Sequence, residues 1–518
     1  MMAGLSLGRA FRQIGSLTAL SRIMGFVRDI AFATFLGAGA ASDAFLVALK
    51  LPNMFRRLSA EGAMTNAFLP NYAAIRETYG QTAALKLAAE AQIFLILGLS
   101  MLVIIAEIFM TDLILLLAPG FANTPDRLAA ATDLARITMP YLPLISIVAL
   151  WAAIANAHDH FKAGAAAPII ANICFIAGAV MIPFVASHLD SLRALPIAIA
   201  LVGAGFAQLI FLYRALSRFY AVPALIWPRL SDAGRKMWRN FLPAAAGAGG
   251  MQLNLLIDLI LASLLPVGAI SWLYYADRVA QLPLGVVGIA LGTALLPKLS
   301  AAEAAGKPAE VCKNLSEAIG FAGFFVIPAV TGLVLCGLPI IKGLFLYGAF
   351  TVNDAKMAAL ALTAYGCGLP GFVMVKILQT AFYAAGQAAL VLKISLITVA
   401  INVTGSVMLM PILGHVGLAL ATAVSGTVAA AIMLFLLARQ HRLSASFLPV
   451  CGKVMLASTV MGAAIMGLRL VVVSFVSVPA AVGMAVIVGG GGAVYAVTAY
   501  IVGAVPAGLL RQSNDRNT

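Results

Sequence analysis

The sequence predicts an all-α polytopic membrane protein with about fourteen transmembrane helices, one for each apolar stretch of roughly 20 residues. Of its 518 residues, 62% are hydrophobic and only 10% are charged, whereas a soluble globular chain carries about 25% charged residues. The apolar runs are long and lack the alternation of a membrane β-strand. Because backbone groups inside a bilayer must find partners within the chain, such runs are expected to be helices.

The apolar stretches place the expected helices in order along the chain. We expect the second to break at Pro52, because proline lacks the N–H group and its ring disturbs a helix interior. The approximate ranges are 9–36, 42–72, 83–117, 128–157, 165–186, 194–218, 241–265, 269–300, 312–346, 355–385, 389–410, 415–438, 450–475 and 479–509.

A polar, basic stretch at 219–240 separates the sixth and seventh expected helices. We therefore predict an N-terminal lobe over residues 1–225, a C-terminal lobe over 226–445, and a final part over 446–518 with two helices and a polar tail.

An internal echo supports this division. AFLPNYAA at 67–74 resembles ALLPKLSA at 294–301, which begins 227 residues later (294 − 67). A duplicated six-helix unit would give two halves of the same orientation, with a substrate site between them.

Charge in the loops predicts the topology. The chain carries 33 Lys and Arg against 19 Asp and Glu, a net charge of +14, and the basic residues gather in alternate loops. The positive-inside rule then places both termini in the cytoplasm. The excess of positive charge is also expected to attract anionic membrane lipids to the protein. No nucleic-acid partner is expected.

Residues 21–72 carry charged side chains inside segments apolar enough to enter a bilayer. Such groups are costly there and mark a pathway or binding site. Arg22 and Arg28 can line one wide cavity, and Asp29 can orient a neighbouring guanidinium group. The alternative is that the arginines reach out to the membrane interface; this applies more to Arg22 than to the deeper Arg28.

The next expected helix carries a second charged stripe. Asp43, Lys50 and Arg57 recur every seven residues, which is a single face on an unbroken helix. If Pro52 breaks that register, Arg56 becomes the inward residue instead. A salt-bridged structural face is the alternative to a binding site.

The second half has a matching element at 271–300. Asp277 and Arg278 stand in the middle of an otherwise uncharged span, and at the offset of 227 Lys50 falls on Asp277. Arginine suits bidentate binding of phosphate oxygens. Basic groups in both halves therefore predict an anionic, phosphorylated, lipid-linked substrate.

A group of oxygen-bearing side chains suggests a separate site. Asn402 and Ser406 lie four residues apart on one expected helix, and Thr422 lies in the first half of the next. Together with Asp258 they form a candidate site for a monovalent cation or a proton. A hydrogen-bonded structural role for Asp258 is an equal alternative.

We identify no catalytic residues and expect no other cofactor. The sequence contains no P-loop, no HExxH and no acidic cluster, and the five cysteines form no CxxC pair.

The residues at 21–72, SRIMGFVRDIAFATFLGAGAASDAFLVALKLPNMFRRLSAEGAMTNAFLPNY, resemble the signature of the MurJ (MviN) family of lipid II flippases. YYADRVAQLPLGVVGIALGTALLPKLS resembles that family's eighth-helix motif. The resemblance covers essentially the whole chain. It implies membership of the MOP exporter superfamily, with two six-helix lobes in a MATE-like V shape followed by two C-terminal helices.

The resemblance also implies a function and a site. The expected substrate is lipid II, the undecaprenyl-pyrophosphate-linked disaccharide pentapeptide, moved from the cytoplasmic to the periplasmic leaflet by alternating access. An Arg-rich central cavity would bind the headgroup, and a groove along the last two helices would hold the lipid tail. The residues matching the essential cavity of the family are Arg22, Arg28, Asp29, Asp43, Arg56 and Arg278, with Lys50 and Asp277 beside them.

Some family members carry an acid where this chain has Gln281, and some hold sodium in the C-terminal lobe. The sodium ligands would correspond to Asp258, Asn402, Ser406 and Thr422. The expected location is the bacterial inner membrane, with the cell-wall synthesis machinery as a further expected partner. The alternatives are an exporter of another polyprenyl-linked oligosaccharide and a membrane enzyme acting on polyprenyl phosphates.

Overall fold

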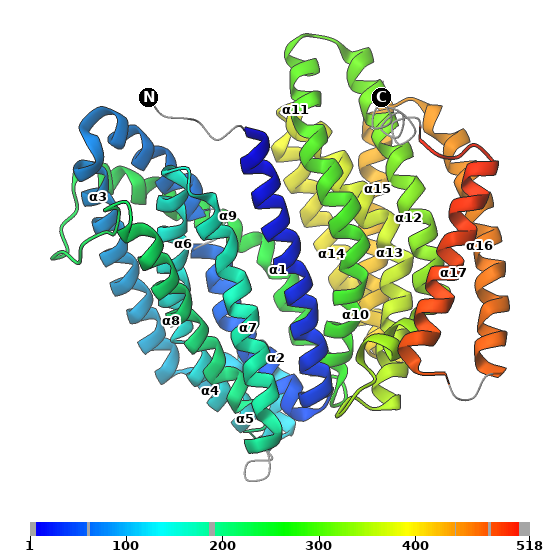
Figure 1. Cartoon of the computed structure of the whole chain (residues 1–518), viewed down its shortest axis with the longest axis horizontal. Helices are drawn as coiled ribbons and strands as arrows, with labels where there is room; N and C mark the ends of the chain where they lie inside the picture. The colour runs from blue at the N-terminus through cyan, green and yellow to red at the C-terminus, as the bar shows by residue number, and fades with distance from the viewer. Residues whose placement is uncertain (1–6, 60–62, 186–191, 441, 475–477, 507–518) are drawn as a thin grey trace. The chain divides into compact units, whose positions relative to one another are not determined.

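The computed structural model describes residues 7–59, 63–185, 192–440, 442–474 and 478–506, and every regular element in these ranges is helical (Figure 1). Eleven of the described helical stretches are long and apolar enough to cross a membrane. This confirms the predicted all-helical membrane fold. The count of about fourteen spans stays a prediction.

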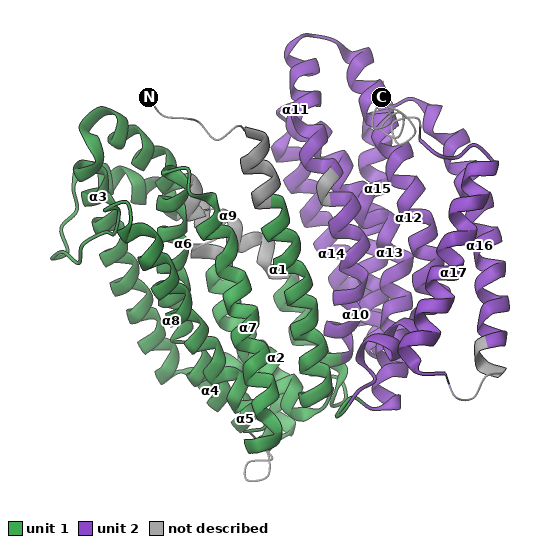
Figure 2. Cartoon of the chain, in the orientation of Figure 1, with its two compact units in different colours: residues 1–271, 348–350 green, residues 272–347, 351–518 purple. Residues whose placement is uncertain are grey.

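The chain divides into two compact units (Figure 2). Unit 1 comprises Met1–Ser271 and Gly348–Phe350, and unit 2 comprises Trp272–Tyr347 and Thr351–Thr518. The helices of unit 1 are α1 (Leu7–Leu36), α2 (Ala40–Ser59), α3 (Ala63–Ile108), α4 (Met110–Leu117), η1 (Pro119–Asn123), α5 (Pro125–Thr138), α6 (Tyr141–Ala157), α7 (Phe161–Val185), α8 (Leu195–Ser217) and α9 (Asp232–Ser263).

The second set of helices begins with α10, whose first turn still belongs to unit 1. These helices are α10 (Ala269–Pro283), the π-helix η3 (Leu284–Ile289), α11 (Ala290–Ala304), α12 (Pro308–Phe345), α13 (Val352–Ala384), α14 (Ala388–Leu413), α15 (His415–Arg439), the short η4 (Ala445–Phe447), α16 (Leu448–Ser474) and α17 (Ala480–Ile501).

The expectation that Pro52 breaks the second helix is wrong. Helix α2 runs through Pro52 to Ser59. The carbonyl of Ala48, which loses its intrahelical partner because Pro52 has no N–H, lies 3.4 Å from the hydroxyl of buried Thr138 on α5. This tertiary contact offsets part of the cost of the proline, so the helix continues.

Other expected boundaries also shift. The stretch predicted to close the second helix instead opens α3, which contains a kink at Gly80, where φ is 84°. A conformation with positive φ is easiest for glycine. The expected helix 128–157 is divided between α5 and α6 near Pro140.

The C-terminal helices attach to α12 where prolines have freed its carbonyl groups. Pro328 cannot donate to the carbonyl of Phe324 one turn earlier. The hydroxyl of Tyr495, on α17, donates a hydrogen bond to that oxygen at 2.5 Å. An unpaired carbonyl in an apolar environment is costly. The hydroxyl of Tyr495 satisfies the carbonyl of Phe324, and this hydrogen bond attaches α17 to α12.

The same arrangement recurs eleven residues later. Pro339 leaves the carbonyl of Leu335 without an intrahelical donor, and Nη1 of Arg469, on α16, donates to it at 2.9 Å. Apolar packing around Cys336 and Ile465 surrounds this contact. Both C-terminal helices are therefore held on α12 by specific hydrogen bonds as well as by apolar contacts.

The compact units differ from the lobes expected from the sequence, because α9 packs against α3 and α2 within unit 1. At its end, Ser263 Oγ accepts a hydrogen bond from the N–H of Gly120 at 3.1 Å. A side chain at Gly120 would collide with the backbone of Ser263 and Leu264. The predicted lobe boundaries at 225–226 and 445–446 stay predictions about which helices move together.

Candidate functional site

Arg28 is held in place by two neighbouring side chains. Its Nε and Nη2 atoms lie 3.1 and 2.8 Å from Oδ1 of Asp29, and its Nη1 atom donates to Oδ1 of Asn172 at 3.1 Å. The guanidinium also lies over the rings of Phe32 and Phe175, at 5.7 and 5.5 Å from their centroids. Asp29 therefore contacts the guanidinium that it is predicted to orient, and its role in a binding site stays a prediction.

Asn172 is a support that the sequence reasoning missed. It lies on α7, is buried, and also donates from Nδ2 to the backbone oxygen of Ser21 at 3.2 Å. Its amide lies against α1 at Gly25. A polar amide in the apolar stretch of α7 was the available signal, because buried polar groups require partners.

The other basic residues of the first two helices differ in exposure. Arg22 is exposed, whereas Lys50 and Arg56 are partly buried on α2. The side chain of Arg57 lies outside the described residues. The proposed membership of Arg22, Lys50 and Arg56 in one binding site stays a prediction.

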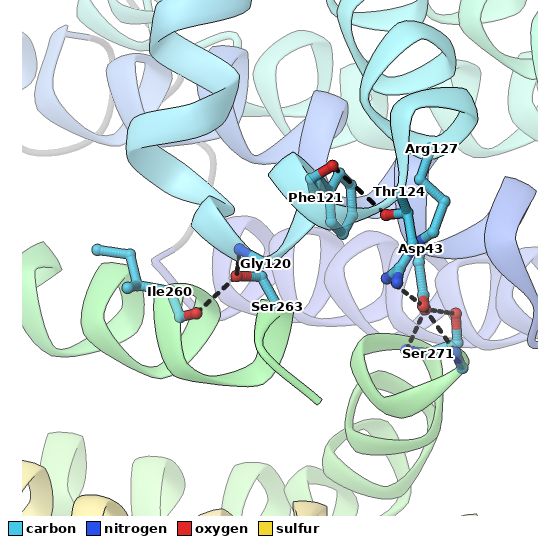
Figure 3. A network of polar contacts seen from close by, with 9 residues as sticks. Asp43, Gly120, Phe121, Thr124, Arg127, Ile260, Ser263 and Ser271 are labelled. Carbon is cyan, nitrogen blue, oxygen red and sulfur yellow. Dashed lines mark hydrogen bonds and ion pairs between the residues drawn. The ribbon is translucent and has the colours of Figure 1, made fainter. Parts of the chain in front are cut away.

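Asp43 is the centre of a buried polar network (Figure 3). Its carboxylate accepts hydrogen bonds from the N–H of Gly268 at 2.7 Å, from the N–H of Ser271 at 3.0 Å and from Ser271 Oγ at 2.6 Å. Arg127 Nη2 completes the set at 3.0 Å. Asp43 is 0% exposed, so in this conformation its carboxylate is engaged with the protein itself. Its assignment to substrate binding stays a prediction.

Arg127 is the second residue that sequence reasoning missed. It opens α5 and is 6% exposed, and its guanidinium lies 4.2 Å from the ring centroid of Phe121. Its place between two apolar stretches is typical of an ordinary loop charge. Its one distinguishing signal is that it is the only basic residue between Lys86 and Arg136.

The charged pair of the second half lies on α10. Arg278 lies over the ring of Tyr274, with 4.8 Å between the guanidinium carbon and the ring centroid. Asp277 accepts a hydrogen bond from the side-chain amide of Gln281, one turn along the helix. The side chain of Gln281 therefore acts as a donor to a carboxylate.

Immediately after this pair the helix changes character. Residues Leu284–Ile289 form a π-helix, a form that occurs frequently at functional sites. Gly288 of this stretch and Gly292, in the first turn of α11, lie against Lys376 of α13. The Cβ of Lys376 is 3.7 Å from the place where a Cβ on residue 288 would stand. Lys376 is exposed within an apolar span. It is a further candidate site residue that sequence reasoning did not single out.

The candidate cation ligands separate into two groups. On α14 and α15, Thr422 Oγ1 lies 3.3 Å from Oδ1 of Asn402. Ser406 Oγ, one turn from Asn402, is buried without a hydrogen-bond partner. Asp258 is on α9 in unit 1. Among the described residues, no cluster of three or more His, Cys, Asp or Glu side chains could hold a metal ion.

Comparison with known proteins identifies relatives of the whole chain. A family model described as lipid II flippase MurJ matches residues 32–488. A probable lipid II flippase MurJ of Rhizobium tropici is 34% identical over 99% of this chain and 97% of its own length. The lipid II flippase MurJ of Burkholderia cenocepacia is 32% identical over 83% of this chain and 84% of its own.

Solved structures share the fold. A lipid II flippase MurJ in an inward closed conformation superimposes with a TM-score of 0.76 at 24% identity, covering 94% of this chain and 98% of its own. An inward-facing MATE multidrug resistance transporter of the MOP superfamily gives 0.65 at 14% identity, covering 83% and 97%. At these identities the likeness establishes the architecture.

Proposed function

Because the chain belongs to the MurJ family of lipid II flippases, we propose that it moves lipid II from the cytoplasmic to the periplasmic leaflet of the inner membrane by alternating access. Its helices make it a multi-pass membrane protein. Alternation of basic loops supports a cytoplasmic location for both termini. We also expect the protein to interact with the cell-wall synthesis machinery.

The observation that carries the proposal is the support around Arg28. A guanidinium held by Asp29 and Asn172 keeps its planar fork in a fixed orientation, and such a fork matches phosphate oxygens in pairs. Its side chain is still 18% exposed. Arg28 would therefore replace part of the water around a pyrophosphate without a change in the orientation of its own side chain.

Other residues have distinct proposed roles. Arg278 is a further candidate for a phosphate contact, and Arg22, Lys50, Arg56 and Asp277 stay candidates for contacts to the headgroup. Lys376 adds a cation about 12 Å, or eight residues, before the end of α13. Asp43 acts indirectly, because its three hydrogen bonds to Gly268 and Ser271 fix the start of the helix that carries Arg278.

The proposal includes coupling to a monovalent cation. Asn402, Ser406 and Thr422 provide neutral oxygens, and the unsatisfied hydroxyl of Ser406 fits a site that lacks a ligand in the protein alone. Binding of a sodium ion or a proton would couple transport to the gradient of that ion across the membrane, because moving its charge through the membrane potential releases free energy. Asp258 is the carboxylate expected from the family.

A reconstituted vesicle assay tests the function. Lipid II is placed in vesicles with the purified protein, and the fraction accessible to a reagent outside is followed over time. We expect accessibility to change only with active protein, and lipid II to be recovered chemically unchanged, as for a transporter. Equal rates with and without the protein would reject the proposal, and a modified product would indicate an enzyme.

A further inference from the structure

The connection between α8 and α9 is an irregular segment, residues 219–231, that is fixed at both ends. At its start, Gln81 Nε2 donates to the backbone oxygens of Phe219 and Tyr220 at 3.0 and 3.1 Å. At its end, the buried carboxylate of Glu90 accepts hydrogen bonds from the N–H and Oγ of Ser231, at 3.1 and 2.6 Å. Both supporting side chains belong to α3, so the segment has a defined path across unit 1.

The middle of this segment presents large apolar side chains to the outside. Tyr220, Leu225 and Trp227 are 88, 76 and 83% exposed, and Tyr220 adopts a positive φ of 51°. Because the ends are hydrogen-bonded while these side chains are not covered by the protein, their exposure is built into the structure. Exposed apolar groups gathered in this way indicate an interaction surface.

The charge around the segment is strongly positive. Between positions 214 and 239 the chain has six basic residues and one acid, Asp232. The two that flank the apolar side chains most closely, Arg218 and Arg229, are exposed. A surface that combines tryptophan, tyrosine and arginine is complementary to the headgroup region of an anionic bilayer.

The position of the segment points to the same occupant. Helix α8 is apolar enough to span the membrane and ends at Ser217, two residues before the segment begins. A segment this close to the end of a span lies at the membrane surface. We propose that residues 219–231 bind the surface of the adjoining leaflet, with Leu225 and Trp227 at headgroup depth and Arg218 and Arg229 on the phosphates of anionic phospholipids.

Fluorescence of Trp227 tests the depth of the segment. The full chain is reconstituted in phosphatidylcholine vesicles containing phosphatidylglycerol, with lipids brominated near the headgroup end of the acyl chain as quenchers. The difference between the wild type and Trp227→Phe isolates the emission of Trp227. We expect this emission to be quenched by the brominated lipids and shielded from aqueous acrylamide. Emission that stays open to acrylamide would overturn the proposal and point to a protein partner.

Trp238 provides an internal control for this measurement. Its ring packs edge-on to Phe241 and Phe94, with centroid separations of 5.0 and 6.4 Å. The difference between the wild type and Trp238→Phe should therefore show little quenching by the shallow brominated lipids.

Energy transfer from the protein to headgroup-labelled phosphatidylglycerol tests the role of charge. The double variant R218Q/R229Q should bind this lipid about 25-fold more weakly at low salt, since each basic group near a membrane surface contributes about fivefold. The control K307Q/K313Q removes two exposed lysines at the start of α12 in unit 2 and should leave the signal from this segment unchanged. Equal affinities for R218Q/R229Q and the wild type would reject the proposed phosphate contacts. Flipping of lipid II is measured separately and does not decide this test.

Discussion

Asp43 and Ser271 are joined by two hydrogen bonds, from the Ser271 N–H at 3.0 Å and from its Oγ at 2.6 Å, so that a carboxylate on α2 caps the first turn of α10. The next residue, Trp272, donates from Nε1 to Oδ1 of Asp354 at 2.8 Å. Ser271 is the last residue of this part of unit 1, and Trp272 is the first of unit 2. The chain therefore leaves unit 1 between two consecutive residues that are each held by a different carboxylate.

The first prediction concerns this network. Asp43→Asn should lower the free energy of unfolding by about 3–5 kcal/mol, because it leaves the guanidinium of Arg127 buried without its counter-charge. Thermal unfolding in detergent measures the change. D43N/R127M removes both charges and should recover part of the loss. If the single variant is as stable as the wild type, the network has no structural role.

Arg28 is predicted to be essential through its geometry as well as its charge. Arg28→Ala should abolish complementation of a strain depleted of its own flippase, although the protein is still inserted. Arg28→Lys keeps the charge but cannot bind two phosphate oxygens in one plane, so we expect at most weak complementation. Membrane levels measured by immunoblot provide the control. Normal growth with Arg28→Ala would contradict the proposed site.

Lys376 should matter for its charge. Lys376→Met is expected to weaken lipid II binding about tenfold, the effect of losing one charge-assisted contact of about 1.4 kcal/mol, and Lys376→Arg should restore it. Lys356, an exposed lysine near the other end of the same helix, supplies the matched control Lys356→Met. Titration of purified protein with lipid II measures all three variants. If Lys376→Met and Lys356→Met weaken lipid II binding equally, the effect is one of overall charge and Lys376 does not contact the substrate.

The proline-linked contacts of α12 can be tested by a double-mutant cycle. Tyr495→Phe removes the hydroxyl that bonds the Phe324 carbonyl and should destabilise the protein by about 1–3 kcal/mol. In a Pro328→Ala background the alanine N–H can satisfy that carbonyl, so the same substitution should cost much less. The thermal unfolding of the four proteins gives the coupling. Additive effects would contradict the explanation.

His158 predicts a dependence of stability on pH. It lies just beyond α6 and hydrogen-bonds to Tyr72 at 3.2 Å. Burial lowers its pKa below the ordinary 6.5, with further lowering from the charges of Arg76 and His160, and Asp159 opposes them. The unfolded chain therefore takes up a proton first as pH falls, and stability decreases from about pH 6.5 down to the pKa of the folded state.

The measurement is the unfolding temperature between pH 8 and pH 5, compared with that of His158→Gln. The variant should lose part of the decrease below pH 6.5, the ordinary pKa of the group. A wild-type protein whose stability does not change over this range would show that His158 is not linked to folding.

The sequence alone determined the class of protein and the chemistry of its candidate ligand. Long apolar runs with few charges leave only helices in a bilayer, and arginines inside such runs indicate an anionic substrate. The Arg28–Asp29 pair was predictable because the two residues are adjacent.

Tertiary structure decided which charges are structural. Asp43 meets Arg127 across 84 positions and Ser271 across 228, and no periodicity along one helix reveals such partners. It also decided where prolines are tolerated, because the hydroxyls and guanidinium that satisfy the freed carbonyls come from other helices. The local pattern of apolar and polar residues determines where the helices form and which polar groups are costly to bury. Only the packing of helices that are distant in the sequence determines whether each of those groups finds a hydrogen-bond partner.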